Sequence, residues 1–283
     1  MKLKQALAHA REVLAENDIE DASLESEFLL RNALGKSRTQ LYLDLDLELS
    51  PIHEESFHRL IERRRRGEPS AYITGHREFY GIDFYVDHNV LIPRPESELL
   101  VEKAVNLAQT REIMTIAEVG TGCGAIAISL ARNLPGVKIY ATDISTAALE
   151  VAGINCRKHG LLDRIVLLPG DMLEPLPEPV DLIVANLPYV RESELPRTGP
   201  VSFEPVMALD GGPDGMTMIG RLCRQAGKKL RPGGCMLLEI GWEQGKTVTA
   251  LLQNTFPSAR IEVTPDLSGK DRMAGLYLTL DFH

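Results

Sequence analysis

Four consecutive residues in the middle of the chain combine groups that can hold a planar amino group. Asn186-Leu187-Pro188-Tyr189 follows the apolar, β-branched segment 180–185, which predicts a strand buried on both faces of a parallel sheet. Ligands of such sheets bind just beyond the carboxyl ends of the strands. The run offers two hydrogen-bond acceptors, the Asn186 side chain and the Leu187 carbonyl, beside an aromatic ring, and Pro188 keeps the chain extended. The same residues also fit an ordinary turn after a strand.

A glycine-rich loop upstream predicts a nucleotide site. Between an expected strand ending at residue 119 and a helix beginning near Ala125 lies the run Gly120-Thr121-Gly122-Cys123-Gly124. Glycines let the backbone turn tightly and come close to a ligand. Asp143 ends the next expected strand about 20 residues further on, where an acid can accept hydrogen bonds from both ribose hydroxyls. Because Gly120, Gly122 and Ala125 also satisfy the dinucleotide fingerprint, the loop alone leaves NAD open as the cofactor.

Three features favour S-adenosylmethionine over NAD. Gly124 completes a G-x-G-x-G pattern, which suits an amino-acid carboxylate as well as a phosphate. After the third expected strand, Asp171 can accept a hydrogen bond from adenine N6, and the Met172 thioether can pack on the ring. The segments 260–263 and 275–280 have no helix between them and predict a closing antiparallel pair, whereas an NAD fold would continue with parallel units.

Several single residues of this predicted site have a plainer interpretation as well. Glu118 ends the first strand and fits a partner for the cofactor ammonium, or an ordinary carboxylate at a strand end. Ile144 directly follows Asp143 and is predicted to contact the cofactor with it. Ser145 and Asp171 could each cap a helix instead.

The elements that position these residues alternate between strand and helix. Strands are expected at 114–119, 137–142, 164–169, 180–185 and 234–240, and helices at 124–134, 146–158, 215–229 and 243–254. This alternation is typical of an α/β fold with a doubly wound, mostly parallel sheet, here of seven strands with the closing pair included.

The N-terminal part of the chain predicts a small all-helical domain, residues 1–68. Apolar residues recur at helical spacing in 3–14, and a second run contains Leu24, Phe28, Leu29 and Leu34. Gly35 ends that run, Ser37 can cap a short helix, and Ser50-Pro51 starts a further one.

Residues 69–90 are expected to form a hairpin linker around Tyr80-Gly81, and residues 91–283 the α/β domain. The last helix of the N-terminal part ends at Arg63-Arg64-Arg65-Arg66. Four cations at a helix C-terminus are favourable for the helix dipole, so we expect them to be solvated rather than to bind RNA, although some of them could still contact an acidic partner.

Composition narrows the class of protein. The chain has 283 residues, a net charge of −9, and 44% hydrophobic and 25% charged residues, which is ordinary for a globular protein. Its acidic balance argues against binding long nucleic-acid tracts. The cysteines are scattered without a paired spacing, so neither a metal site nor a disulfide framework is expected. No signal-like or membrane-spanning apolar run occurs, which predicts a soluble, cytoplasmic protein.

The chain resembles a known family. The glycine loop, Asp143, Gly170-Asp171 and Asn186-Leu187-Pro188-Tyr189 look like motifs of amino-methylating class I methyltransferases. More specifically, three stretches resemble release-factor glutamine methyltransferases: Ala71-Tyr72-Ile73-Thr74-Gly75, Leu91-Ile92-Pro93-Arg94-Pro95-Glu96-Ser97-Glu98, and Phe203-Glu204-Pro205 through Ala208-Leu209-Asp210-Gly211-Gly212-Pro213-Asp214-Gly215. The resemblance covers nearly the whole chain; the second and third stretches are specific, whereas the glycine loop is not.

The resemblance implies a Rossmann-like class I methyltransferase fold that binds S-adenosylmethionine. The implied cofactor residues are Glu118, Gly120, Thr121, Gly122, Cys123, Gly124, Asp143, Ile144, Asp171, Met172 and Asn186. The implied activity is methylation of the glutamine side-chain nitrogen in the Gly-Gly-Gln motif of peptide-chain release factors. These factors are then the partners, docked by the helical domain, and neither stable nucleic-acid binding nor a membrane is expected.

In this family the catalytic residues follow the pattern Asn-Pro-Pro-Tyr, which implies Asn186, Leu187, Pro188 and Tyr189 here. Leucine replaces the first proline, but the family uses the main-chain carbonyl at this position, and leucine retains it. A glutamine amide nitrogen is a poor nucleophile because its lone pair is shared with the carbonyl. Acceptors on both of its N–H bonds can stabilise the charge that develops on nitrogen.

Other functions are compatible with parts of the sequence. An adenine-N6 methyltransferase acting on DNA or RNA needs the same acceptors for an exocyclic amino group, but it must also capture a base and follow a phosphate backbone. An NAD-dependent oxidoreductase would not need Asn186 and Tyr189 after the fourth strand. A binding module without activity would not need both acceptors.

Overall fold

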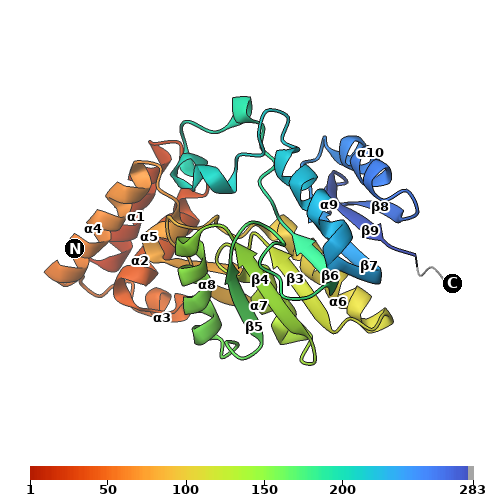
Figure 1. Ribbon diagram of the computed structural model, residues 1–283. Helices are drawn as coiled ribbons and strands as arrows, with labels where there is room; N and C mark the ends of the chain where they lie inside the picture. The colour runs from red at the N-terminus through yellow and green to blue at the C-terminus, as the bar shows by residue number, and fades with distance from the viewer. Residues whose placement is uncertain (280–283) are drawn as a thin grey trace. The chain divides into compact units, whose positions relative to one another are not determined.

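The computed structural model of the chain describes residues 1–279 (Figure 1). Contacts within the chain divide these residues into two compact units. The first comprises Met1–His76 and Pro196–Phe203, and the second comprises Arg77–Leu195 and the described chain from Glu204 onwards. Of the expected linker 69–90, the helix α5 falls in the first unit and the residues from Arg77 onwards in the second.

The first unit is helical. Its elements are α1 (Leu3–Ala15), α2 (Ala22–Leu34), α3 (Arg38–Leu43), α4 (Pro51–Arg65), α5 (Ser70–Thr74) and the 3₁₀ turn η3 (Pro200–Phe203). The predicted ends are confirmed: Gly35 adopts the left-handed conformation at the end of α2, and the Ser37 and Ser50 side chains accept from backbone N–H groups of α3 and α4. The core of this unit contains Leu14, Leu29, Leu30, Leu41, Phe57 and Ile61.

The apolar face of α2 is not quite the one that the sequence suggests. Leu29 and Leu30 are buried, but Leu24 is 62% and Phe28 37% exposed. The buried residues of α2 also include Glu27 and Ser26, and Ser26 donates to the Ala22 carbonyl within the helix. The helix that the sequence predicts over this run is confirmed, although two of the apolar residues that mark it, Leu24 and Phe28, are exposed.

The arginines at the end of α4 are largely paired within the first unit. Arg63 donates to both carboxylate oxygens of Glu68, at 2.8 and 2.5 Å. Arg64 is buried, and its Nε donates to Glu25 at 3.2 Å. The prediction that these side chains are solvated is wrong for Arg64, because an acid on α2 neutralises its charge away from water.

The second unit begins with a two-stranded hairpin, β1 (His76–Phe79) and β2 (Ile82–Tyr85). Its two turn residues, Tyr80 and Gly81, both have positive φ, 53° and 68°. This is the type I′ geometry that matches the twist of the flanking strands. The hairpin predicted around these residues is confirmed.

The main sheet of the second unit has seven strands in the order β5-β4-β3-β6-β7-β9-β8. They are β3 (Thr115–Val119), β4 (Lys138–Asp143), β5 (Ile165–Pro169), β6 (Val180–Ala185), β7 (Leu230–Glu239), β8 (Arg260–Pro265) and β9 (Asp271–Tyr277). The strands from β3 to β7 are parallel, and β9 is antiparallel to β7 and β8. The predicted doubly wound sheet with its closing antiparallel pair is confirmed; only Leu280 of that pair lies outside the described residues.

One strand starts earlier than the sequence suggests. β7 begins at Leu230, which pairs with Val180, rather than at residue 234. The register between β6 and β7 shifts between Val180 and Leu182. The segment Pro232-Gly233-Gly234 therefore lies in an irregular part of the strand rather than before it.

Helices connect the strands on both faces of the sheet. They are α6 (Glu98–Thr110), α7 (Ala125–Asn133), α8 (Thr146–Lys158), α9 (Thr217–Lys229) and α10 (Gly245–Thr255), with the 3₁₀ turns η1 (Pro95–Ser97), η2 (Glu192–Glu194) and η4 (Val206–Ala208). The chain moves from β3 to β4 in one direction across the sheet and from β6 to β7 in the other. Because parallel crossovers are right-handed, α7 and α9 cover opposite faces.

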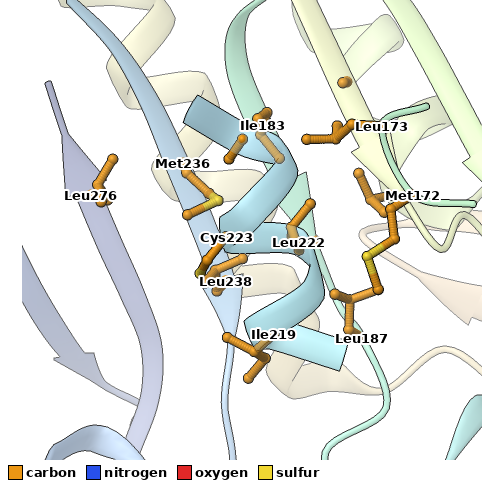
Figure 2. Close-up of a cluster of buried hydrophobic side chains, with 14 of the residues drawn as sticks. Met172, Leu173, Ile183, Leu187, Ile219, Leu222, Cys223, Met236, Leu238 and Leu276 are labelled. Carbon is orange, nitrogen blue, oxygen red and sulfur yellow. The ribbon is translucent and has the colours of Figure 1, made fainter. Parts of the chain in front are cut away.

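The core between α9 and the sheet reaches the loop after β6. Figure 2 shows Ile219, Leu222 and Cys223 of α9 packed towards the sheet, with Leu187 and Met172 at one end of the same cluster. Leu187 is buried, so its side chain anchors the loop in the core. None of the helices in residues 1–279 is long and apolar enough to cross a membrane.

Candidate active site

The predicted site residues follow neighbouring strands. Val119, the last residue of β3, lies opposite Thr142 of β4 and Ala185 of β6. The carboxyl ends of these strands therefore meet at one edge of the sheet. The strand order reverses between β3 and β6, which is where open α/β sheets form ligand crevices.

A cavity of about 440 Å³ opens at this edge, within the size range of sites for small organic ligands. The predicted residues that line it are Glu118, Gly120, Thr121, Gly122, Cys123, Asp143, Ile144, Asp171, Met172, Asn186, Leu187 and Pro188. Gly124 is not among the lining residues in the described structure. Gly124 precedes α7 with a φ of 83°, a conformation that favours glycine, and a Cβ there would meet Ala152 and Ile128 at 3.4 Å.

The glycine loop lies directly against the acceptor loop. Gly120 and Gly122 have φ values of 74° and 54°, a region that glycine enters without strain. A Cβ on Gly120 would lie 3.3 Å from the Leu187 side chain and 3.6 Å from the Asn186 carbonyl oxygen. The two sequence motifs therefore lie next to each other, with no room for a side chain at Gly120 unless Leu187 moves.

Asp143 ties two loops of the cavity together. Its Oδ2 accepts from the Gly122 N–H and its Oδ1 from the Ser145 N–H, both at 2.9 Å. Burial raises the pKa of Asp143, while these backbone donors act in the opposite direction. Ser145 caps α8 by accepting from Ala148, so the capping interpretation of Ser145 is confirmed.

Glu118 is buried beneath the glycine loop. Its Oε2 accepts from the Thr121 hydroxyl at 2.6 Å and from the Ala127 N–H at 3.0 Å. Burial raises the pKa of Glu118 to about 8. A carboxyl group at this depth takes up its charge easily only when a cation comes close.

The loop after β5 contributes Asp171 and Met172. Asp171 is not a helix cap, because no helix lies between β5 and β6 in the described chain; its Oδ2 accepts from Arg221 of α9 at 2.5 Å. Met172 has a positive φ of 51° and lies near Leu187 in the apolar cluster while also bordering the cavity (Figure 2). Arg221 and Met218 of α9 line the cavity beside this pair.

A second, smaller cavity of about 60 Å³ adjoins the first at the acceptor loop. It offers a few times the space that one water molecule needs. Asn186, Leu187 and Pro188 line both cavities, and Tyr189 and Glu239 line the smaller one. The predicted acceptors thus stand between a large and a small compartment.

Tyr189 is held at both ends. Its hydroxyl donates to Glu239 Oε1 at 3.3 Å, and its carbonyl accepts from Gln244 Nε2 at 3.1 Å. Burial raises the pKa of Tyr189 to about 12, so the phenol is neutral. The Cys123 thiol is also neutral, because burial raises its pKa to about 12.

Several residues of the site were not singled out from the sequence as functional. Ser97 and Arg94 lie within a quoted motif, but their partners are distant: Ser97 donates to Glu239, and Arg94 donates to Glu204. Glu239 could have been predicted from the sequence, because it is an acid at the carboxyl end of a parallel strand, as Glu118 and Asp143 are. No signal of this kind pointed to Arg221.

The chain matches two family models, described as PrmC N-terminal domain over residues 5–75 and Methyltransferase small domain over residues 95–198. The release factor glutamine methyltransferase of Moorella thermoacetica is 45% identical over 274 residues, which cover 96% of this chain and 97% of the relative. The protein of the same name from Bordetella pertussis is 40% identical over 258 residues, 90% of this chain and 94% of the relative.

Among solved structures, the ribosomal protein L11 methylase of Lactobacillus delbrueckii subsp. bulgaricus aligns with a TM-score of 0.51 and 21% identity, over 69% of this chain and 84% of that chain. This likeness supports the methyltransferase fold alone. The identities of 45% and 40% over nearly the full length of both chains go further. The chain belongs to the release factor glutamine methyltransferase family.

Proposed function

We propose that this protein transfers a methyl group from S-adenosylmethionine to the side-chain amide nitrogen of the glutamine in the Gly-Gly-Gln motif of peptide-chain release factors. Family membership supports the substrate. The observation that carries the proposal is the position of Asn186, Leu187 and Pro188, which line both a cofactor-sized cavity and a small one beside it. A reaction between two bound groups needs this arrangement.

The larger cavity suits S-adenosylmethionine in its volume of about 440 Å³ and in the donors and acceptors that line it. The Asp143 carboxylate suits the ribose hydroxyls, the buried Glu118 suits the ammonium group, and the glycine backbone suits the carboxylate. Asp171, with one oxygen held by Arg221, keeps its other oxygen for an adenine amino group. The cofactor supplies an electrophilic methyl group on sulfur.

The residues of this protein bind the substrate amide and stabilise the charge that develops on its nitrogen. Asn186 Oδ1 and the Leu187 carbonyl accept from the two N–H groups of the substrate amide, and Tyr189 packs on the amide plane. A nitrogen–carbon bond forms as the sulfur–carbon bond breaks, and the nitrogen then loses one proton to water. Tyr189 is not the base, since its raised pKa keeps the phenol protonated.

A methylation assay tests the proposal directly. Purified protein is incubated with labelled S-adenosylmethionine and full-length release factor, and peptide mass spectrometry locates the modified residue. We expect one methyl group on the glutamine of Gly-Gly-Gln and none in a factor carrying Gly-Gly-Ala. Label on oligonucleotides and none on release factors would contradict the proposal and favour the adenine-N6 alternative.

Cofactor binding is expected to release a proton. Because burial raises the pKa of Glu118 to about 8, this carboxyl is mostly protonated at pH 7 in the cofactor-free protein. A bound ammonium group lowers that pKa again, so close to one proton leaves per cofactor at pH 7, and the release falls as the pH rises through 8. Calorimetry in buffers of different ionisation enthalpy measures it. Glu118→Gln should release none; equal release from that variant would refute the assignment.

We also propose that residues 1–68 dock the release factor, residues 69–90 connect, and residues 91–283 carry the reaction. The helical unit has exposed apolar side chains, among them Leu43 at 80% and Ile52 at 78% exposure. We expect Leu43→Glu with Ile52→Glu to raise KM for the release factor about fivefold or more, with the cofactor Kd unchanged. Leu162→Glu, at a leucine of the second unit that is 49% exposed, is the control. An unchanged KM would argue against docking by these side chains.

The partner and location follow from the same proposal. Release factors act in translation, so the reaction belongs in the cytoplasm. Stable nucleic-acid binding is not part of it, in keeping with the net charge of −9.

A further inference from the structure

A buried chain of hydrogen bonds runs behind the acceptor loop. Asn186 Nδ2 donates to Ser97 Oγ at 2.9 Å, and Ser97 Oγ donates to Glu239 Oε2 at 2.6 Å. The Tyr189 hydroxyl donates to the other oxygen of Glu239 at 3.3 Å. Glu239 is 2% and Ser97 3% exposed. The four residues come from η1, the loop after β6 and the end of β7, so the contacts join three separate segments.

Which group donates and which accepts in these hydrogen bonds follows from the number of hydrogens that each group carries. A hydroxyl group has one hydrogen, and an ionised carboxylate has none to give. The hydrogen on Ser97 must therefore point at Glu239, and Ser97 turns a lone pair towards Asn186. Burial raises the pKa of Glu239 despite its two hydroxyl donors and the nearby positive charge of Arg272. Both Glu239 oxygens accept from a hydroxyl group, that of Ser97 at 2.6 Å and that of Tyr189 at 3.3 Å, and these two contacts set the direction of the hydrogen bonds.

A lone pair on Ser97 can accept only from the nitrogen end of the Asn186 amide. Oxygen and nitrogen of such an amide have nearly the same shape, so the hydrogen-bond network decides which end is which. With Nδ2 held at Ser97, the oxygen Oδ1 is the end left for the two cavities that Asn186 lines. The reverse orientation would present an NH₂ group to the substrate NH₂ group, donor against donor.

We propose that Ser97 is a positioning residue which, with its hydrogen committed to Glu239, fixes the Asn186 amide so that Oδ1 accepts from the substrate nitrogen. Ser97 acts through Asn186 and forms no bond to the substrate amide. This inference rests on the proposed function, because the acceptor matters only if the substrate brings an NH₂ group. It adds a residue outside the Asn-x-Pro-Tyr run to the machinery of the reaction.

The first test needs no substrate. In a ¹H–¹⁵N spectrum of the full chain, the side-chain amide pair that disappears in Asn186→Ala belongs to Asn186. We expect Ser97→Ala to shift this pair and to speed its hydrogen exchange, and Ser97→Thr to restore it. The matched control is Ser129→Ala, which removes another buried hydroxyl; Ser129 Oγ has no hydrogen-bond partner within the described residues. An Asn186 pair unmoved by Ser97→Ala overturns the proposal.

The second test is a double-mutant cycle on methylation of release factor. We expect Ser97→Ala to lower kcat about tenfold while KM for S-adenosylmethionine stays near the parent value, and Ser97→Thr to recover most of the loss. In the Asn186→Ala background, Ser97→Ala should cost almost nothing more, because the amide that it orients is gone. The same factor lost in both backgrounds would mean a merely structural role. A parent protein inactive on release factors would instead refute the proposed function, and the spectra would still decide the orientation.

Discussion

Replacing Asn186 by alanine is expected to lower kcat for glutamine methylation by about a hundredfold or more. The substitution removes one of two preorganised acceptors for the substrate amide, and the loss of one such contact typically costs a factor of that size. The cofactor Kd should stay close to that of the parent, because the contacts of Asp143 and Glu118 do not involve the Asn186 side chain. Steady-state kinetics together with calorimetry for the cofactor measures both quantities.

Asn133→Ala is the matched control for this variant. Asn133 lies at the end of α7 and donates only to the Ser129 carbonyl of the same helix among the hydrogen bonds observed for it. It should leave both kcat and the cofactor Kd unchanged. Full turnover by Asn186→Ala, in protein that still binds cofactor, would remove Asn186 from the acceptor site and with it the mechanism proposed above.

The fold was predictable because its signals are local. The buried strands read as short apolar runs, and most of their ends agree with the structure to within a residue or two, as at β3 and β6. Helix ends in the first unit were marked by Ser37, Ser50 and Gly35, each of which makes the expected cap. Parallel strands then bring their carboxyl ends to one edge, which is why residues far apart in the chain could be assigned to one site.

What the sequence did not reveal depends on contacts between distant segments. Ser97 and Glu239 are 142 positions apart, and Asp171 and Arg221 are 50 apart. No spacing rule connects such pairs, since they are set by how the helices and loops pack on the sheet. The same reason applies to α2, where Phe28 has helical spacing but faces away from the core.

Packing around Leu187 explains how its carbonyl can keep a fixed direction without a proline ring. A leucine in place of the family proline loses the ring that stiffens the backbone. In the structure its side chain is buried in the cluster with Met172 and Ile219 (Figure 2), and it lies against Gly120. Anchoring by burial takes the place of the ring, so the direction of the carbonyl is still constrained.

Replacing Asp143 by alanine should raise the cofactor Kd about a hundredfold. The carboxylate is proposed to accept from two ribose hydroxyls, and a hydrogen bond to a charged group contributes roughly 1.5–3 kcal/mol. It also holds the Gly122 and Ser145 N–H groups, so the variant loosens the loop as well. Asp266→Ala is the control for the loss of a carboxylate that holds backbone N–H groups, because Asp266 likewise accepts from those of Ser268 and Lys270, but in the turn between β8 and β9. Calorimetry with S-adenosylmethionine should show parent-like affinity for Asp266→Ala; if Asp143→Ala matches it, the ribose is bound elsewhere.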